Sequence, residues 1–192
     1  MSTPLRDVRF AVVDVETSGV SRERHHVLQV GVVIVDGDGN VLDRWSSLVR
    51  PHNRWFFRVG PTHVHGIRRR DVRSAPRAAQ VMGELAARLA GTRFVAHNVP
   101  FDLGFLRKAA TSVGVELPIG QPVCTLRLSR ALDPGRTMSH KLLDVCTRYG
   151  VTLDRPHDAL ADAEATAAVL PHLLRAHGVQ TADQLEGLPA PR

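Results

Sequence analysis

The stretch AVVDVETSGV, residues 11–20, places two carboxylates, Asp14 and Glu16, at the end of an apolar strand. Alternate residues of a strand point to the same face, so both acids share the face of Val12 and lie about 6–7 Å apart. Burying two like charges side by side is costly unless a cation neutralises them. The strand therefore either ends at Val13 in a solvated turn, or it carries both acids to a bound cation.

The rest of the chain predicts a mixed sheet with helices packed on it. Apolar strands are expected at residues 8–15, 27–35 and 41–49, and a DGDGN turn joins the last two. Residues 51–73 show no regular period and are expected to be irregular. After residue 74 the apolar period becomes helical. The elements expected there are helices at about 74–91, from 100 onward, at 139–149 and at 158–176, and short strands at 93–97 and 122–126. A strand meander followed by alternating helices and strands is typical of an α/β domain.

The length of 192 residues suits a single domain. We assign residues 1–178 to that domain and residues 179–192 to a short, frayed C-terminal tail. No apolar run reaches the roughly 18–20 residues of a membrane span, and the N-terminal segment lacks the apolar core of a signal peptide. Cys124 and Cys146 show no paired spacing, which predicts free thiols. Together these features predict a cytoplasmic protein without a membrane segment.

The charge balance is basic, with a formal net charge of +6 and a pI near 10.5. Arginine supplies nearly all of the positive charge, since lysine occurs only at Lys108 and Lys141. The guanidinium fork matches phosphate oxygens, so this balance favours a polyanionic partner. An arginine-rich coding bias would give the same balance without any ligand, and charge alone does not separate the two explanations.

Two further segments combine acidic residues with helix starts. In HNVPFD, residues 97–102, Asp102 falls in the first turn of a predicted helix, where the helix dipole favours a carboxylate. In HDALAD, residues 157–162, His157 precedes a helix and Asp162 lies just over one turn inside it. Taken singly, each residue has an ordinary structural explanation as a capping or solvated group.

Taken in order, the three segments resemble the DEDDh subgroup of the DnaQ-like 3′–5′ exonucleases, the family of the proofreading epsilon subunit of bacterial DNA polymerase III. DVETSG resembles the first motif of that family and HNVPFD the second. His157, five positions before Asp162, resembles the third. Three motifs in the right order are far more specific than one. The resemblance extends from about Arg9 to His177.

This resemblance implies a ribonuclease-H-like fold, with a mixed five-stranded sheet flanked by helices. It also implies two divalent ions, Mg²⁺ or Mn²⁺, because oxygen ligands suit such hard cations. By resemblance, the metal-binding residues are Asp14, Glu16, Asp102 and Asp162, and the general base is His157. The implied reaction is 3′–5′ hydrolysis of single-stranded DNA ends to nucleoside monophosphates, in proofreading or repair, with a DNA polymerase as a partner.

Contacts to the terminal nucleotide are expected from loops that flank these motifs. THVHGI, residues 62–67, resembles the HGI segment of the family. The substrate-binding residues expected on this basis are Thr17, Ser18, Val20, His65, Gly66, Ile67 and Asn98. The chain departs from the family at Gln29, where many members carry Glu, which affects local hydrogen bonding rather than the metal ligands.

Three alternatives to a DNA exonuclease stay open from the sequence. The first is the same chemistry on RNA 3′ ends or short oligoribonucleotides, which depends on contacts to the 2′-OH. The second is a non-catalytic nucleic-acid-binding module, which would be expected to lack one of the five catalytic residues. The third is a zinc protein, although the histidine spacings are poor for zinc.

Overall fold

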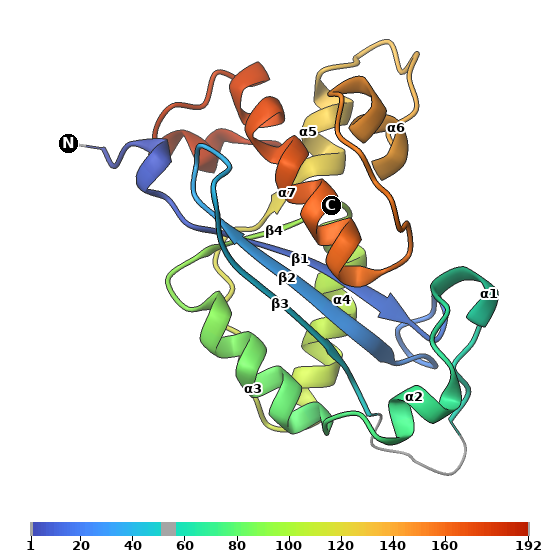
Figure 1. Cartoon of the computed structure of the whole chain (residues 1–192). Helices are drawn as coiled ribbons and strands as arrows, with labels where there is room; N and C mark the ends of the chain where they lie inside the picture. Colours follow the sequence, from blue (N-terminus) through green and yellow to red (C-terminus); the bar gives the residue numbers. More distant parts are fainter. Residues whose placement is uncertain (1, 51–56, 192) are drawn as a thin grey trace.

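The computed structural model describes residues 2–50 and 57–191, which form a five-stranded sheet between two layers of helices (Figure 1). The strand order is β3-β2-β1-β4-β5. The strands are β1 (Phe10–Thr17), β2 (Val27–Val35), β3 (Val41–Leu48), β4 (Arg93–Ala96) and β5 (Val123–Cys124). The first three strands are antiparallel, whereas β4 and β5 run parallel to β1. The predicted mixed five-stranded α/β architecture is confirmed.

The helices follow the strands in chain order. They are α1 (Thr62–His65), α2 (Arg69–Arg73), α3 (Ala78–Leu89), α4 (Val99–Thr111), α5 (Thr125–Ala131), α6 (Leu142–Arg148) and α7 (Ala159–Ala176). On one face of the sheet, α3 and α4 pack over Ala11, Val13 and Val15 of the central strand. On the other face, α5, α6 and α7 pack over Phe10 and Val12. The period-2 alternation of β1 therefore divides its side chains between two cores.

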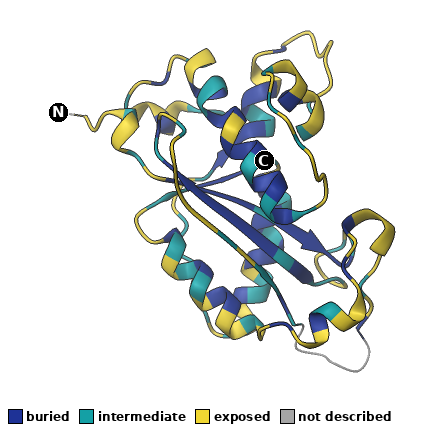
Figure 2. Ribbon diagram, in the orientation of Figure 1, coloured by how far each residue is buried: buried dark blue, intermediate teal, exposed yellow. Residues whose placement is uncertain are grey.

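Burial follows this layering. Strands β1 and β2 are buried almost throughout, while the edge strand β3 is largely exposed (Figure 2). A third apolar cluster of Leu28, Phe57, Ile67 and Val72 anchors the segment that carries α1 and α2 to the end of β2. In the described part of the chain, no helix combines the length and the apolar character needed to cross a membrane.

Three sequence predictions were wrong in detail. Residues 59–73, expected to be irregular, contain the short helices α1 and α2, while residues 51–56 lie outside the described part. Helix α3 begins at Ala78 rather than after Ser74, because the Pro76 carbonyl accepts a hydrogen bond from Arg50 N–H and keeps the chain extended. Helix α6 begins at Leu142 rather than near Ser139, whose carbonyl accepts a hydrogen bond from Arg148.

The C-terminal segment is not frayed as expected. Leu5 N–H donates to the Gln180 carbonyl, and Pro4 pairs with Thr181 as an isolated bridge. Leu185, in a 3₁₀ turn at Asp183–Gly187, is buried in the core cluster beneath α7. Backbone pairing with residues 4–5 and the apolar side chains of Val179, Leu185 and Leu188 thus tie this segment to the domain.

Candidate active site

The first two carboxylates lie on the central strand. Asp14 pairs with Gly31 of β2, and Glu16 pairs with Gln29, just before a register shift between Glu16 and Thr17. Glu16 is 9% exposed. The strand therefore does not end at Val13 in a solvated turn, and it carries both acids into the protein.

Asp102 reaches the same place from the opposite face of the sheet. It lies in the first turn of α4, where Pro100 favours helix initiation, and it is 4% exposed. Its Oδ1 accepts a hydrogen bond of 3.3 Å from the backbone N–H of Val15, between the two acids of β1. That bond fixes the carboxylate of α4 against the central strand.

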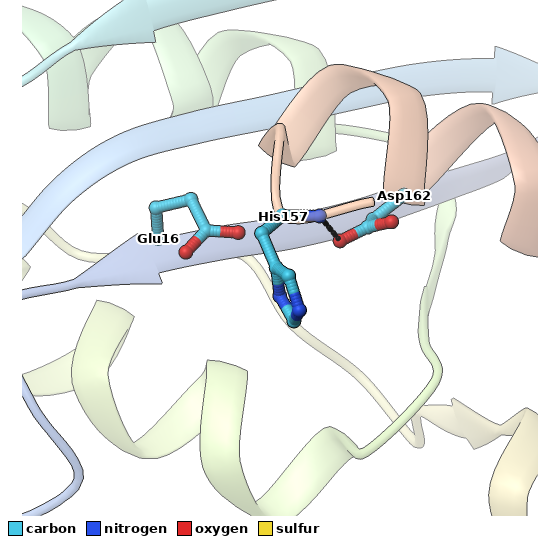
Figure 3. Close-up of side chains that lie close together, drawn as sticks. All are labelled: Glu16, His157 and Asp162. Atoms are coloured by element: carbon cyan, nitrogen blue, oxygen red, sulfur yellow. Dashed lines mark hydrogen bonds between the residues drawn. The ribbon is translucent and has the colours of Figure 1, made fainter. Parts of the chain in front are cut away.

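The third contribution comes from the start of α7. Asp158 caps this helix by accepting a hydrogen bond from Ala161 N–H, and Asp162 lies in the first turn. His157 precedes the cap with φ of +67°, and its N–H donates to Asp162 Oδ2 at 3.0 Å. A non-glycine residue in this left-handed region is strained by roughly 1–2 kcal/mol, and the bond to Asp162 helps to hold it. Figure 3 shows Glu16 and Asp162 on either side of His157.

Gly31 explains how α7 comes so close to the sheet. A Cβ atom added at Gly31 would lie 2.2 Å from the carbonyl oxygen of Ala159, the first residue of the helix. The missing side chain lets the helix backbone rest directly on β2, opposite Asp14. Gln29 supports the same junction, since its Oε1 accepts from Ala159 N–H at 3.4 Å and its Nε2 donates to Ser46 Oγ at 3.2 Å.

All five predicted catalytic residues line one cavity of about 380 Å³. The other lining residues are Val15, Thr17, Gly19, Val20, Pro61, Val64, His65, His97, Asn98, Phe101 and Leu142. The acids and His157 lie beside a largely apolar wall. Ligand atoms of Glu16, His157 and Asp162 lie within 4.8 Å of one another.

Burial and mutual repulsion make these carboxyl groups hard to ionise. Desolvation, followed by the charges of Asp102, Asp162 and Glu16, raises the pKa of Asp14 well above its usual value. Desolvation and the Asp162 charge raise the pKa of Glu16 to about 7. Burial also raises the pKa values of Asp102 and Asp162, although hydrogen bonds from backbone N–H groups oppose the shift. Ionising all four carboxyl groups together is therefore unfavourable unless a cation compensates their charge.

The donor set fits hard divalent cations. Four carboxylates line the cavity, and its described lining residues include no lysine, arginine or cysteine. Mg²⁺ and Mn²⁺ prefer such oxygen ligands, and their charge would relieve the repulsion among the acids. The residues that would hold these ions are Asp14, Glu16, Asp102 and Asp162.

The predicted substrate residues divide into two groups. Thr17, Val20, His65 and Asn98 line the cavity. Asn98 occupies the N-cap position of α4 without a side-chain capping bond, which leaves its amide available to a ligand. Ser18, Gly66 and Ile67 do not line the cavity.

The three remaining residues shape the loops around it. Ser18 is buried, and its hydroxyl accepts a hydrogen bond from His26 N–H. Gly66 ends α1 with φ of +69°, a left-handed conformation that suits glycine. Ile67 packs in the third apolar cluster, and its N–H donates to Nδ1 of His65. Because that nitrogen accepts, Nε2 of His65 carries the proton and donates to the Val59 carbonyl at 3.0 Å.

Sequence reasoning missed several wall residues. Val64 of α1, Phe101 of α4 and Leu142 of α6 supply apolar surface from segments far apart in the chain. His97 was also missed, although it begins the second motif. Its Nε2–H donates to the His140 carbonyl at 3.0 Å, and its Nδ1 accepts from the Thr125 hydroxyl at 3.0 Å. His97 thus joins the end of β4 to α5 and to the segment before α6.

The half-buried His97 should make the stability of the protein fall in acid. Desolvation lowers its pKa to about 4, against about 6.5 in the unfolded chain. The unfolded state therefore binds more protons between these values, and stability is lost as the pH falls from about 6.5 to 4. Relative to His97→Gln, the wild type should lose on the order of 2–3 kcal/mol more across that window. Urea unfolding at pH 7.5 and 4.5 measures the difference, and parallel pH profiles of the two proteins would contradict a neutral, desolvated imidazole at His97.

Comparisons with known proteins agree with this geometry. The model of the RNase T family, described as exonuclease, matches residues 11–170. The "DNA polymerase III PolC-type" of Halalkalibacterium halodurans is 32% identical over 87% of this chain. The "3'-5' exonuclease DinG" of Bacillus subtilis is 31% identical over 86% of it. The chain spans only 11% and 18% of the lengths of these two relatives.

Solved structures share the fold. E. coli exonuclease I, bound to a dT13 oligonucleotide, superposes with a TM-score of 0.75 at 19% identity, covering 88% of this chain and 41% of that one. Exonuclease X, in complex with 5′ overhanging duplex DNA, superposes with a TM-score of 0.70 at 26% identity, covering 93% and 99%. With its acidic cavity at the junction of β1, α4 and α7, and with the family model matched over most of its length, the chain belongs to the RNase T family of exonucleases.

Proposed function

We propose that this chain is a metal-dependent 3′–5′ exonuclease that releases nucleoside monophosphates from single-stranded DNA ends. One observation carries the proposal: Asp14, Glu16, Asp102 and Asp162 converge from three elements on one cavity with His157 at its edge. The cavity of about 380 Å³ lies within the usual range of small-ligand sites. A terminal nucleotide is a ligand of that class, and its phosphate would meet the acids through bound cations.

The side chains of the cavity have different proposed roles in hydrolysis. Two divalent ions on the carboxylates would supply a bound water of lowered pKa and stabilise the charge that develops on the phosphate. The water oxygen bonds to phosphorus, the bond from phosphorus to the 3′-oxygen breaks, and that oxygen leaves with a proton. His157 is exposed and able to accept the proton of the attacking water. Val20, Val64 and Phe101 would hold the terminal base without reading its sequence.

The variant His157→Asn tests the role of the imidazole. Asparagine tolerates the left-handed backbone of this position, so the start of α7 should be kept. We expect kcat to fall about 10²–10⁴-fold, the usual contribution of a general base, with affinities for Mn²⁺ and for single-stranded DNA within about threefold of the wild type.

Metal titration separates the two roles that the geometry allows His157. A ring nitrogen of His157 and carboxylate oxygens of Glu16 and Asp162 lie within 4.8 Å of one another, so the three could bind one ion. An Mn²⁺ affinity that falls in step with turnover would make His157 a metal ligand instead of the base. The exposed His63, which does not line the cavity, provides the control variant His63→Ala.

The choice of DNA over RNA is tested with two 5′-labelled strands of identical sequence. We expect a shortening ladder from the DNA and a slower one from the RNA, measured as initial rates with Mn²⁺. Because the 2′-OH is the group that differs, a faster ladder from RNA would move the chain to the RNA-trimming alternative. Tight binding of both strands with cleavage of neither, under all metal conditions, would support a binding module.

A DNA polymerase is the proposed partner. The support is that relatives of PolC type carry a segment similar to this chain within a much longer polymerase. Removal of mismatched 3′ ends during synthesis is the activity such an association would provide. We propose the cytoplasm as the place of the reaction, because the relatives of PolC type are proteins of bacteria, whose DNA is replicated there.

A further inference from the structure

A second cavity, of about 740 Å³, lies at the C-terminal end of α5. It is lined by Arg127, Arg130, Ala131, Asp133, Pro134, Arg136, His140, Pro189 and Ala190. We call it the basic cavity, and it shares no lining residue with the carboxylate cavity. Its size is within the range of ligand sites, and three of its nine lining residues are arginines.

Asp133, the one carboxylate among the described lining residues of the basic cavity, is already engaged by its own loop. Asp133 Oδ2 accepts from Met138 N–H at 2.9 Å and lies 3.3 Å from His140 Nε2. The Thr137 hydroxyl donates to Asp133 Oδ1 at 3.1 Å. The Met138 bond and its neighbours lower the pKa of Asp133, which keeps the group anionic and committed to the loop. Both carboxylate oxygens of Asp133 are thus occupied by contacts within its own loop.

Two arginines of the basic cavity, Arg130 and Arg136, are therefore available to an outside anion. Among the ion pairs of the described residues, none includes Arg130 or Arg136. A guanidinium donates two parallel hydrogen bonds to phosphate oxygens, which makes phosphate the ligand chemistry that fits best.

The basic cavity and the carboxylate cavity are both lined by residues of one short segment. His140 lines the first and Leu142 the second. Two residues of chain span at most about 7 Å. In addition, the His140 carbonyl accepts the hydrogen bond from His97, which lines the carboxylate cavity. A nucleic-acid strand with its 3′ end at the acids would need only a few nucleotides to reach the arginines.

We propose that the basic cavity binds a backbone phosphate of the same strand whose 3′ end occupies the carboxylate cavity. This inference rests on the proposed function and adds a second, sequence-independent contact to it. A strand that engages both cavities gains from effective concentration, whereas a mononucleotide does not. The contact also releases counterions, so it makes binding more dependent on salt.

The test compares long and minimal substrates in two variants of equal charge. Arg130→Gln/Arg136→Asn empties the basic cavity of two guanidinium groups. Asparagine tolerates the φ of +50° at Arg136, so this variant should fold. The control Arg6→Gln/Arg77→Gln removes two exposed arginines that line neither cavity.

For a single-stranded DNA 20-mer, we expect the basic-cavity variant to raise KM about tenfold and to lower the slope of log KM against log salt by about 1–2. Hydrolysis of thymidine 5′-monophosphate p-nitrophenyl ester, which reaches only the carboxylate cavity, should match the control. A KM for the 20-mer equal to that of the control would overturn the inference. If that unchanged KM for the 20-mer came with loss of inorganic phosphate binding in the basic-cavity variant, the basic cavity would be a site for small anions and not for the strand.

Binding of a fluorescent 20-mer, followed by anisotropy, keeps the two proposals distinguishable. If the wild type hydrolyses neither substrate but binds the 20-mer more tightly than the basic-cavity variant does, the phosphate site stands and the exonuclease proposal fails. If hydrolysis occurs and the two variants bind the 20-mer equally, the exonuclease stands and the phosphate site fails.

Discussion

The substitution Asp14→Asn is expected to stabilise the metal-free protein and to abolish its metal-dependent hydrolysis. Burial and four neighbouring carboxylates, those of Asp102, Asp162, Glu16 and Asp158, hold the pKa of Asp14 above its unfolded value. The ionised cluster therefore destabilises the fold, and removing one charge without changing the shape of the side chain relieves this. We expect a gain of about 1–3 kcal/mol near pH 7.5 in EDTA, or ~2–8 °C in Tm.

The sign of the pH dependence follows from the direction of this shift. The pKa of this carboxyl group is about 4 in the unfolded chain and higher in the folded protein. The folded protein is therefore destabilised as the pH rises from the unfolded pKa through the folded pKa. The advantage of Asp14→Asn should thus vanish near pH 4 and grow toward pH 8. Excess Mn²⁺ should reverse it, because only the wild type keeps the complete ligand set.

Turnover of Asp14→Asn should fall by about 10³-fold or more, since several kcal/mol of transition-state stabilisation depend on the ions. Differential scanning fluorimetry with and without Mn²⁺ measures stability, and release of nucleotides from single-stranded DNA measures activity. Asp38→Asn, at an exposed position, is the control. A variant that is less stable than the wild type in EDTA would contradict the proposed electrostatic strain.

The substitution Gly31→Ala is expected to damage stability and activity together. The added Cβ would meet backbone atoms of Ala159 and Leu160 at 2.2–2.5 Å, and backbone cannot rotate away as a side chain can. Helix α7 must move off β2, at a cost of about 1–3 kcal/mol. Because Asp162 and His157 sit at the start of that helix, a displacement of about 1 Å should lower kcat about 10²-fold.

Gly83→Ala provides the matched control. Gly83 lies inside α3, and an added Cβ there meets nothing within 4 Å. Alanine favours the helix over glycine, so this variant should gain up to about 1 kcal/mol with unchanged turnover. Chemical unfolding and steady-state kinetics of both variants separate the effects. Wild-type kcat in a folded Gly31→Ala protein would show that the contact of α7 with β2 does not position the acids.

The strands were predictable because their signals are local, and the five residues that we propose as catalytic were singled out by the resemblance of three short motifs to the family. The alternation around Asp14 and Glu16 and the capped start of α7 are each encoded within about ten residues. By contrast, the close approach at Gly31 depends on a helix more than a hundred residues later in the chain. A glycine in a strand indicates that another backbone or a ligand approaches closely, but it does not show which segment does so.

The walls of both cavities were not predictable for the same reason. Val64, Phe101 and Leu142 meet only after the sheet has brought α1, α4 and α6 together. The basic cavity joins α5 and its following loop to Pro189 in the C-terminal segment. The arginine content of the sequence favoured a polyanionic partner. Which arginines line one cavity depends on the tertiary structure and could not be read from the sequence.

The most direct test of the proposed activity compares linear and circular single-stranded DNA of the same sequence. The linear strand carries a 5′ label, and both are incubated with Mn²⁺ and with the wild type or Asp14→Asn. We predict a ladder that shortens from the 3′ end of the linear strand, an intact circle, and no products with the variant. Cleavage of the circle, early release of the labelled 5′ nucleotide, or a ladder that persists with Asp14→Asn would contradict a 3′–5′ exonuclease built on these carboxylates.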